Sequence, residues 1–560
     1  MALADRLARP PAWWGSVALI LVVAALVAGI GTTTLPLEGH EALVVQTAQE
    51  MHARGDYIVP YFNAEPRLVK PPLSYWFTGA TAGLFGDPGH IEPWHGRLPS
   101  ILAGLGLCGL AITLGRLGYD RATGLSAGLL LGTSAGFFAY THNARPDLLY
   151  AFWCAAGYTA FAEAWRSTPG SLAERLWAYA MWGAYGLATL TKGPQLPLML
   201  LVACALYAGL GGPGWRHGLR TLRPFAGVPI LCALTLPWWL MLHHRLGATG
   251  LYGSQLSGTL LIPDWRALLD PYYLYRPLQL VLPWVLMVVP AVLFVRRSGR
   301  EGAAAWLACI VLVPALLLSF GVQRRWFYML PVLPALCVLL GAGTVQWLGE
   351  GPPARTWRAW FVALHGLLIL AALAWLLAFV APATEQGPIA LCLALGIPLF
   401  LWVAVRRIRH RGSWLGDMAV VAVMAAVVFI GLGATRLLWS QDRFERQRLA
   451  QAAARGAGPD APFLSLGINP NVFVYYTGRH IRWVRTLKGL TRALAEAPRG
   501  EARAIVQSHY LDELSSCCIV ELLDSMPGDR DEATSVVTLH LKNRPHGLRP
   551  SSPHFSPPRH

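Results

Sequence analysis

Apolar runs of fairly uniform length alternate with short polar connections through the first 435 residues of this chain. A helix that crosses the hydrocarbon core of a bilayer needs about 20 apolar residues, with a range of about 17–25. The pattern predicts about 13 such helices, at residues 17–35, 97–114, 122–140, 148–165, 177–191, 195–211, 224–242, 278–295, 304–321, 329–348, 359–380, 388–405 and 417–435. Residues 1–435 therefore indicate an all-α polytopic membrane protein.

Basic residues orient the predicted spans. Every second connection is short and rich in arginine, as between the second and third spans and after the eighth, twelfth and other even-numbered spans. Basic connections of this kind stay on the cytoplasmic side. We therefore expect a cytoplasmic N-terminus that acts as a retained signal anchor, a multi-pass protein of the cell (inner) membrane, and an extracytoplasmic C-terminal region. The first loop, residues 36–96, also falls outside.

The composition changes after the last span. Residues 436–457 are typical of a polar helix that leaves the membrane. Short runs rich in β-branched and aromatic residues follow. We predict strands at Phe463–Leu466, Val472–Tyr476, Ile481–Val484 and Ala504–Gln507, and helices at Leu487–Ala497 and Tyr510–Ser515. Residues 436–544 are thus expected to form a small extracytoplasmic α/β domain, and residues 545–560, rich in Pro, Ser and His, a disordered tail.

The overall composition agrees with the predicted spans. Hydrophobic residues make up 54% of the chain and charged residues only 14%, whereas soluble domains carry about 25% charged residues. The net charge of +16 is interpreted as topology signals and contacts with lipid headgroups, with no nucleic-acid partner. Most cysteines lie in apolar segments. Cys517 and Cys518 are adjacent near the C-terminus, where we expect a structural role, and no His/Cys spacing typical of a metal site occurs.

The first loop carries candidate chemistry. Glu38 and Glu41 flank His40 there. If residues 41–52 form a helix, Glu41 lies in its first turn, where a negative charge is favoured by the helix dipole. A catalytic carboxylate and a carboxylate that only caps the helix both fit this position.

Two further ionisable residues stand out. Lys70 precedes two prolines, which keep it off a regular helix. It is placed to bind a lipid phosphate as a point charge, or to extend its ammonium group to the membrane surface without a ligand. Asp147 precedes a span, where it is a candidate acid or a simple N-cap. Lys192, at the end of another span, is interpreted as an interfacial lysine.

Several motifs together resemble a known family. They are HEALVVQTAQEM, GDYIVPYFNAEPRLVKPPLSYW, GRLPS at 96–100, ARPDLLY at 144–150, LTKGP at 190–194, LPWW at 236–239, LPW at 282–284 and FYMLPVLPAL at 327–336. Their order and spacing over residues 15–345 resemble the bacterial relatives of the protein O-mannosyltransferases and the aminoarabinose transferase of lipid A, in glycosyltransferase families 39 and 83. These enzymes have the C-type glycosyltransferase fold.

The resemblance implies a reaction and its partners. A sugar would move from a polyprenyl phosphate to an extracytoplasmic acceptor, which is lipid A, another glycolipid, a polysaccharide or a protein. Membrane lipid is a further partner. Displacement at the anomeric carbon passes through an oxocarbenium-like state, so cations must stabilise the leaving phosphate, and a base must take the acceptor's proton.

The family's residues fall on specific positions of this chain. Its catalytic acid falls on His40, a departure, so the base is His40, Glu41 or Glu38. We favour Glu41, with His40 beside it. Asp147 corresponds to the family's second external acid. The expected contacts to the donor phosphate are Lys70, Arg97, Arg145 and Tyr328, with Arg276, Arg324 and Arg325 as weaker candidates.

Two alternatives and one cofactor question stay open. A transporter or flippase of lipid-linked substrates would need ionisable residues within its spans, whereas this chain has them at span ends. A family member that binds polyprenyl lipid without catalysis is the other alternative. The residue that helps bind a divalent metal in the aminoarabinose transferase corresponds here to Val69, so no cofactor is expected with certainty.

Overall fold

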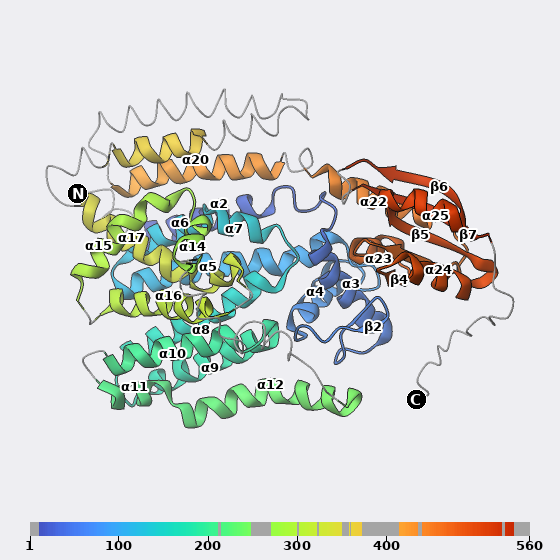
Figure 1. Cartoon of the computed structure of the whole chain (residues 1–560). Coiled ribbons are helices and arrows are strands. Elements are labelled where there is room, and N and C mark those ends of the chain that lie inside the picture. Colours follow the sequence, from blue (N-terminus) through green and yellow to red (C-terminus); the bar gives the residue numbers. More distant parts are fainter. Residues whose placement is uncertain are drawn as a thin grey trace.

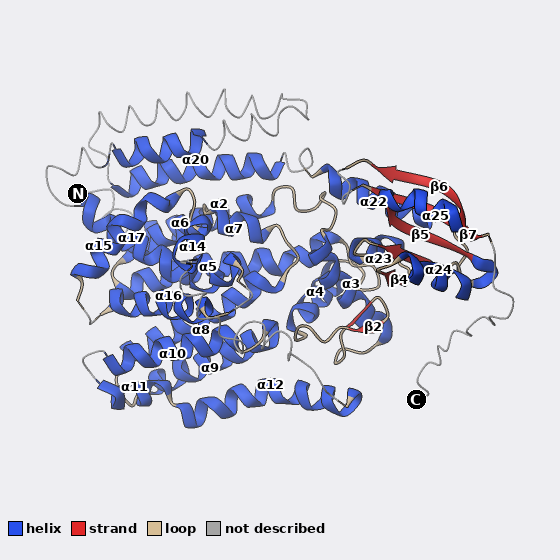
Figure 2. Ribbon diagram, in the orientation of Figure 1, coloured by secondary structure: helices blue, strands red, loops and turns tan. Residues whose placement is uncertain are grey.

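The structure, a computed structural model, describes residues 10–210, 214–247, 270, 272–299, 302–321, 324–349, 358, 360–371, 414–434, 440–528 and 533–542. A bundle of helices occupies one side and a sheet from the C-terminal region the other (Figures 1 and 2). The predicted span at 388–405 and the predicted tail at 545–560 lie outside the described residues. The predicted span at 359–380 is described only in part, as an apolar helix over Trp360–Ala371.

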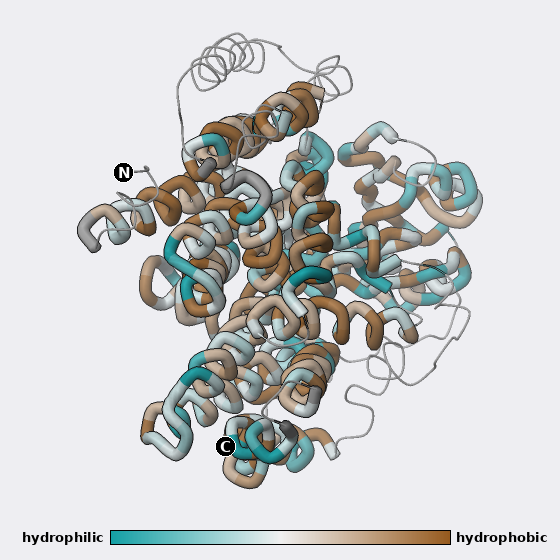
Figure 3. The backbone as a smooth tube through the Cα atoms, turned by 90° about the vertical axis from the view of Figure 1, so that its left-hand side faces the viewer, coloured by the Kyte–Doolittle hydropathy of each residue, from teal (hydrophilic) through white to brown (hydrophobic). Residues whose placement is uncertain are grey.

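The bundle follows the predicted apolar runs closely. Its helices are α2 (Pro10–Gly29), α5 (Pro93–Gly118), α6 (Arg121–Gly132), α7 (Ala135–Thr141), α8 (Pro146–Arg166), α9 (Leu172–Lys192), α10 (Gln195–Leu210), α11 (Gly214–Leu222), α12 (Pro224–Leu246), α14 (Tyr272–Leu280), α15 (Val288–Arg297), α16 (Ala303–Ser319), α17 (Leu333–Gly349) and α20 (Trp414–Ala434), with short 3₁₀ helices η3 (Trp284–Met287) and η4 (Trp326–Val332). Hydrophobic residues recur along these helices (Figure 3).

The part of the chain that is described does not confirm the predicted 13 spans. Five helices there are long and apolar enough to cross a membrane, and a bent pair, α6 and α7, makes a sixth. Several others, such as α10 and α16, are apolar but shorter. The structure therefore supports a membrane protein with several spans.

Two predicted spans are broken. The run at 122–140 forms α6 and α7, which meet at an angle of 53°. Ser134 begins α7 by accepting a hydrogen bond from the Phe137 backbone N–H at 3.3 Å, and the Ala135 N–H bonds outside the helix, to the carbonyl of Leu282 at 2.8 Å. The run at 278–295 is likewise divided among α14, η3 and α15. Hydropathy detects the apolar run but not a capping residue that interrupts it.

Small residues allow the bundle helices to approach closely. A Cβ added at Gly115 of α5 would lie 2.7 Å from the Cα of Gly124 in α6, and one added at Gly124 would lie 2.5 Å from the Ile112 carbonyl oxygen. Glycines at such contacts are common between membrane helices, because packing rather than the hydrophobic effect associates them there.

The first loop is an ordered layer between the bundle and the C-terminal sheet (Figure 1). It contains α3 (Gly39–Arg54), a hairpin of β1 (Tyr61–Phe62) and β2 (Glu65–Pro66), and α4 (Leu73–Phe85). Residues 41–52 do lie in a helix, α3, and Glu41 is in its first turn. The hairpin turn holds Asn63 and Ala64 at positive φ, and the Glu50 carboxylate accepts a hydrogen bond from each of their N–H groups at 2.8 and 3.1 Å. Helix α3 therefore fixes the tip of the hairpin.

The C-terminal region contains a five-stranded sheet with order β4-β3-β5-β7-β6. Its elements are α22 (Gln441–Ala454), β3 (Phe463–Leu466), α23 (Asn471–Thr477), β4 (Ile481–Val484), α24 (Leu487–Glu496), β5 (Glu501–Gln507), α25 (Leu511–Cys517), β6 (Cys518–Met526) and β7 (Thr534–Leu541). Strand β3 is parallel to β4 and β5, while β7 is antiparallel to β5 and β6.

One predicted strand in this region is wrong. Val472–Tyr476 lies in α23, a helix that ends at Gly478 with φ of 62°. Parallel strands cannot be joined by a tight turn and need a crossover, and α23 is the crossover from β3 to β4. Strands β6 and β7 were not predicted. The adjacent Cys517 and Cys518 stand where α25 gives way to β6, with their sulfur atoms 3.3 Å apart.

Candidate functional site

A group of cations surrounds Asp147 in the first turn of α8. Arg145 donates from Nε to Oδ2 of Asp147 at 3.0 Å, and the Lys192 ammonium, at the last residue of α9, donates to Oδ1. Asp147 is 3% exposed. The helix dipole of α8 favours the negative charge of Asp147 at its N-terminal end, and the dipole of α9 favours the positive charge of Lys192 at its C-terminal end. Lys192, interpreted from the sequence as an interfacial lysine, is therefore part of the site.

Lys70 lies close to this ion pair. It occupies the bend between β2 and α4, is half-buried, and makes no hydrogen bond or ion pair with any described residue. Burial lowers the pKa of the Lys70 ammonium to about 7, since the nearby charge of Asp147 offsets the burial and the repulsion from Lys192 and other cations only in part. We call Lys70, Arg145, Asp147 and Lys192 the Asp147 cluster.

Aromatic rings from η4 complete the cluster. The Lys192 ammonium lies 4.9 Å from the centre of the Tyr328 ring and 5.0 Å from that of Phe327, and the Arg145 guanidinium lies 5.1 Å from the Phe327 ring. Cations at these distances are attracted to the face of the ring. Tyr328, selected from the sequence as a contact to the donor phosphate, therefore lies against Lys192.

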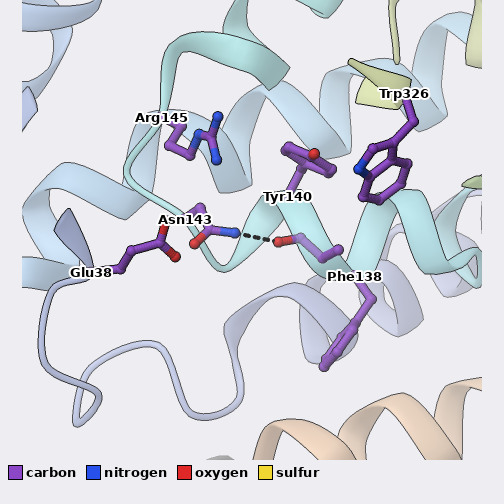
Figure 4. Close-up of a pocket in the computed structure, with 7 residues that line it drawn as sticks. Glu38, Phe138, Tyr140, Asn143, Arg145 and Trp326 are labelled. Atoms are coloured by element: carbon purple, nitrogen blue, oxygen red, sulfur yellow. Dashed lines mark hydrogen bonds between the residues drawn. The ribbon is translucent and has the colours of Figure 1, made fainter. Parts of the chain in front are cut away.

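A cavity of about 260 Å³ opens beside the cluster, and we call it the Glu38 cavity. Glu38, which precedes α3, lines it together with Tyr140, Asn143, Arg145 and Trp326. Figure 4 shows the Glu38 carboxylate next to Asn143, with Arg145 on the same side of the cavity and Tyr140 and Trp326 farther along it. The cavity therefore presents an accessible carboxylate beside a cation of the Asp147 cluster.

His40 lies within electrostatic range of both features. Its side chain is exposed at the start of α3. Partial burial of the ring and the charge of Arg145 place the pKa of His40 below its ordinary value of 6.5, although Glu38 raises it. The imidazole is therefore neutral at pH 7 and able to accept a proton.

Glu41 is enclosed instead of lining either feature. Its side chain is fully buried. Its Oε1 accepts hydrogen bonds from Arg97 Nε at 2.8 Å and from the Ala144 N–H at 2.9 Å. Its Oε2 accepts from Arg97 Nη2 at 3.0 Å, Arg443 Nη1 at 3.1 Å and the Glu38 N–H at 3.0 Å. These donors hold the pKa of Glu41 at about 2 against the effect of burial. A base must reach the acceptor's hydroxyl, so our interpretation of Glu41 as the base does not fit this position.

Arg97 is enclosed by the same contacts. It is fully buried and uses Nη1 and Nη2 to donate to the carbonyl groups of Thr32, Leu35 and Pro36 as well as pairing with Glu41. The expectation that Arg97 contacts the donor phosphate therefore does not fit its geometry either.

Arg443 of α22 was missed by the sequence reasoning. Besides Glu41 it pairs with Glu38, with Nη2 at 3.1 Å from Oε2. No signal in the arginine-rich segment around Arg443 marks one arginine as special. Arg443 connects the C-terminal region to the start of α3. The start of α3 sets the positions of Glu38 and His40.

The weaker candidates lie apart from the cluster. Arg276 stacks over the rings of Tyr272 and Tyr275, at 5.4 Å from each ring centre, and Arg324 pairs with Asp270 at 2.8 Å. Among the described residues, neither arginine forms a hydrogen bond or ion pair with the Asp147 cluster.

The residues at the expected metal position do not fit a metal ion. Val69 is 40% exposed and offers no donor atom. Within the described parts of the chain, no three His, Cys, Asp or Glu side chains come together at metal-ligand distances. We therefore derive no step through a metal.

Comparison with known proteins places this geometry in context. The family model described as dolichyl-phosphate-mannose-protein mannosyltransferase matches residues 69–241. The undecaprenyl phosphate-alpha-4-amino-4-deoxy-L-arabinose arabinosyl transferase of Aeromonas hydrophila is 26% identical over 408 residues, which cover 69% of this chain and 70% of the relative. The corresponding transferase 1 of Pseudomonas fluorescens is 27% identical, covering 63% of this chain and 62% of its own.

Solved structures show the same fold. The crystal structure of ArnT from Cupriavidus metallidurans in the apo state matches with a TM-score of 0.73 at 21% identity, covering 94% of this chain and 98% of that one. The structure of the same protein bound to undecaprenyl phosphate matches with a TM-score of 0.71 at 20% identity, with the same coverage.

Proposed function

We propose that this chain transfers a sugar from a polyprenyl-phosphate donor to an acceptor on the extracytoplasmic face of the cell membrane. The proposal proceeds from its being a membrane glycosyltransferase of the C-type fold, related to the protein O-mannosyltransferases and the lipid A aminoarabinose transferases. The names of its relatives support an undecaprenyl phosphate-linked donor. The N-terminus would then be cytoplasmic, and the first loop and the C-terminal region extracytoplasmic.

The Asp147 cluster carries this proposal. Three basic side chains, Lys70, Arg145 and Lys192, surround one carboxylate, so the cluster has an excess of two positive charges when Lys70 is protonated. A sugar-bound polyprenyl phosphate carries one negative charge, and the phosphate that leaves approaches two. A cluster with this excess stabilises the leaving group more than the donor, and that difference lowers the barrier to transfer.

The transfer step exchanges one bond for another at the anomeric carbon. The bond from this carbon to the phosphate oxygen breaks, and its electron pair stays on the phosphate, held by Lys70, Arg145 and Lys192. The acceptor's hydroxyl oxygen forms the new bond to the same carbon and releases its proton. The side chain of Asp147 has both oxygens paired with cations, so its role in this proposal is to position Arg145 and Lys192.

We favour His40 as the base. It replaces the family's acid and is neutral at pH 7, and its pKa is affected by every charged member of the Asp147 cluster except Lys192. Glu38, which lines the adjoining cavity, is the second candidate and the carboxylate that would stabilise the protonated imidazole. The buried Glu41 supports α3 from behind.

The proposal is tested with purified full-length protein, an undecaprenyl-phosphate sugar and extracted envelope glycolipid as acceptor. We expect transfer by the wild type and loss of at least 10²-fold in Lys70→Ala and Asp147→Asn at normal expression. Lys70→Ala removes a positive charge that holds the leaving phosphate, and Asp147→Asn removes the carboxylate that positions Arg145 and Lys192. Lys488→Ala, at an exposed position of α24, is the matched control. Wild-type-like turnover in either site variant would contradict the assignment.

The same preparation separates the alternatives. A flippase would move the lipid-linked sugar across the membrane of proteoliposomes without forming a new glycosidic bond. A family member without catalytic activity would bind the polyprenyl lipid without turnover. Mass spectrometry of envelope glycolipids from cells with and without the gene would identify the sugar and show whether lipid A is the acceptor.

A further inference from the structure

A second cavity, of about 490 Å³, lies where the first loop meets the C-terminal region. Its walls come from residues 33–36, from Gln49 of α3, from the start of α5, and from Gln447 and Gln451 of α22. The two tyrosines of α23 close it. We call it the glutamine cavity. Its volume falls within the range of about 300–1,000 Å³ typical of small-molecule sites.

Most of the polar side chains that line the glutamine cavity are neutral amides and hydroxyls. No hydrogen bond to a described residue uses the side chains of Thr33, Thr34, Gln447 or Gln451. Gln49 uses only its oxygen, which accepts from the Ile91 N–H at 3.2 Å. Each of the three amides offers both donors and an acceptor, and each threonine hydroxyl can do either. The cavity thus presents mixed donors and acceptors without a fixed charge on those side chains.

Two tyrosine rings are held in place beside these groups. The Tyr475 hydroxyl donates to the Ile91 carbonyl at 2.8 Å, and the Tyr476 hydroxyl accepts from the Leu37 N–H at 2.8 Å. The ring centres are 4.8 Å apart with planes inclined by 79°. The Tyr475 proton is thereby used, whereas the Tyr476 hydroxyl can still donate, so the two rings offer the cavity apolar surfaces and one hydroxyl donor.

The side chains around the cavity disfavour a phosphorylated ligand. No lysine or arginine lines it, and its ionisable side chains are Glu92 and His90. A phosphate group would meet a carboxylate there and neither of the permanently charged cations that usually hold phosphates in proteins by charge-assisted hydrogen bonds. An uncharged sugar, whose hydroxyls donate and accept and whose C–H faces pack on aromatic rings, matches the lining instead.

We propose that the glutamine cavity binds an uncharged sugar unit of the acceptor, an inference that rests on the transfer function proposed above. The segment that carries Leu35 and Pro36 in the wall of this cavity continues directly to Glu38, which lines the Glu38 cavity. A glycan bound between α22 and the first loop is thus held next to the point of transfer. The acceptor is recognised there through a neutral carbohydrate and not through a phosphate.

Binding is tested with full-length protein in nanodiscs by saturation-transfer NMR. The probes are neutral trisaccharides of mannose, glucose and N-acetylglucosamine, and a glucosamine disaccharide carrying two phosphates. We expect at least one neutral trisaccharide to bind the wild type and to lose at least tenfold in affinity in Gln447→Leu/Gln451→Leu. Gln441→Leu, on the same helix but outside the cavity, should bind as the wild type does.

Three results would overturn the inference: no neutral trisaccharide binds the wild type, the double variant binds equally well, or the phosphorylated disaccharide binds and is lost in the double variant. Equal unfolding temperatures of the double variant and Gln441→Leu confirm that the fold is intact. If the double variant unfolds earlier, Thr34→Val, at an exposed position outside any regular element, is measured in its place with the same criteria.

The transfer assay separates this inference from the proposed function. We expect the double variant to raise the KM for the acceptor about tenfold and to leave the KM for the donor unchanged. If the wild type transfers no sugar, the proposed function fails, whatever the NMR result. If it transfers sugar while the double variant keeps the wild-type KM for the acceptor, only the inference fails.

Discussion

Replacing Glu41 by glutamine separates support of the site from chemistry at the site. The change keeps the size of the side chain but removes its charge. Arg97, which is fully buried, then loses the carboxylate with which it pairs, and Arg443, which is 14% exposed, keeps only its ion pair with Glu38. Glu41→Gln should therefore destabilise the fold severely while the Asp147 cluster keeps its own charges.

The structure sets the magnitude in two ways. Removing one partner of a buried ion pair costs about 3–5 kcal/mol, because the remaining charge is left buried. The pKa of Glu41 falls from an ordinary value near 4.5 to about 2, and each pH unit of that fall corresponds to about 1.4 kcal/mol, which gives about 3 kcal/mol. We expect Glu41→Gln to lower the free energy of unfolding by about 3–5 kcal/mol at pH 7.

The direction with pH follows from the same pKa. Between pH 4.5 and pH 2 the Glu41 carboxyl binds a proton in the unfolded chain but stays charged in the folded protein. The contribution of the charged Glu41 to the free energy of unfolding is therefore complete above about pH 4.5. It is lost as the pH falls towards 2. The difference in stability between the wild type and Glu41→Gln should therefore shrink between pH 4.5 and pH 2.

The assay measures unfolding and turnover on the same samples. Denaturant titrations in detergent micelles give the free energy of unfolding, and transfer is measured per folded molecule at low temperature. Glu65→Gln, at an exposed position of the first loop, is the matched control and should change neither quantity. Each single variant, Arg97→Met or Glu41→Gln, leaves the other residue of the pair as a buried charge without its partner. The double variant Arg97→Met/Glu41→Gln removes both charges, so it should lose less stability than the sum of the two single variants.

One outcome would refute this reasoning. If Glu41→Gln unfolds like the wild type but loses transfer by 10²-fold or more per folded molecule, Glu41 takes part in the chemistry and the roles given to His40 and Glu38 are wrong.

Three further predictions concern the donor site, the base and the contact between the two regions. Since Lys70 has a pKa of about 7 and binds phosphate only when protonated, the KM for the donor should rise by up to about tenfold per pH unit above pH 7, and Lys70→Arg should flatten this dependence. His40→Asp restores the family's acid and should keep transfer within about tenfold of the wild type. His40→Ala should lower the rate of transfer about 10²–10⁴-fold. If His40→Asp is inactive, the proposed role of His40 is wrong. Asn63→Gly removes two hydrogen bonds to the backbone of Ile481, at 2.8 and 2.9 Å, which contribute about 1 kcal/mol each. Amide hydrogen exchange in β4 should therefore become faster in this variant. Unchanged exchange would show that the hairpin does not hold the sheet.

Local sequence patterns predicted much of the fold. Within a bilayer every backbone polar group must be satisfied inside its own helix, so an apolar run by itself indicates a helix, as in α5, α8 and α12. Local chemistry also decided the helix after Glu38 and the bend at Lys70 before two prolines. Where the patterns failed, a distant partner decided: the β-prone residues of α23 became a helix because β3 and β4 are parallel.

The sequence by itself determined a membrane protein with an ordered, charged loop, and it selected Lys70, Asp147 and His40 as candidates. Only the tertiary structure decided which charges meet. Glu41 pairs with Arg443, 402 residues away, and Asp147 with Lys192, 45 residues away. The physical reason is that a helical pattern depends on neighbours within one turn, whereas the protonation and accessibility of a carboxylate depend on the packing around it. Glu41 and Glu38 are three residues apart, yet one is sealed by arginines and the other lines a cavity.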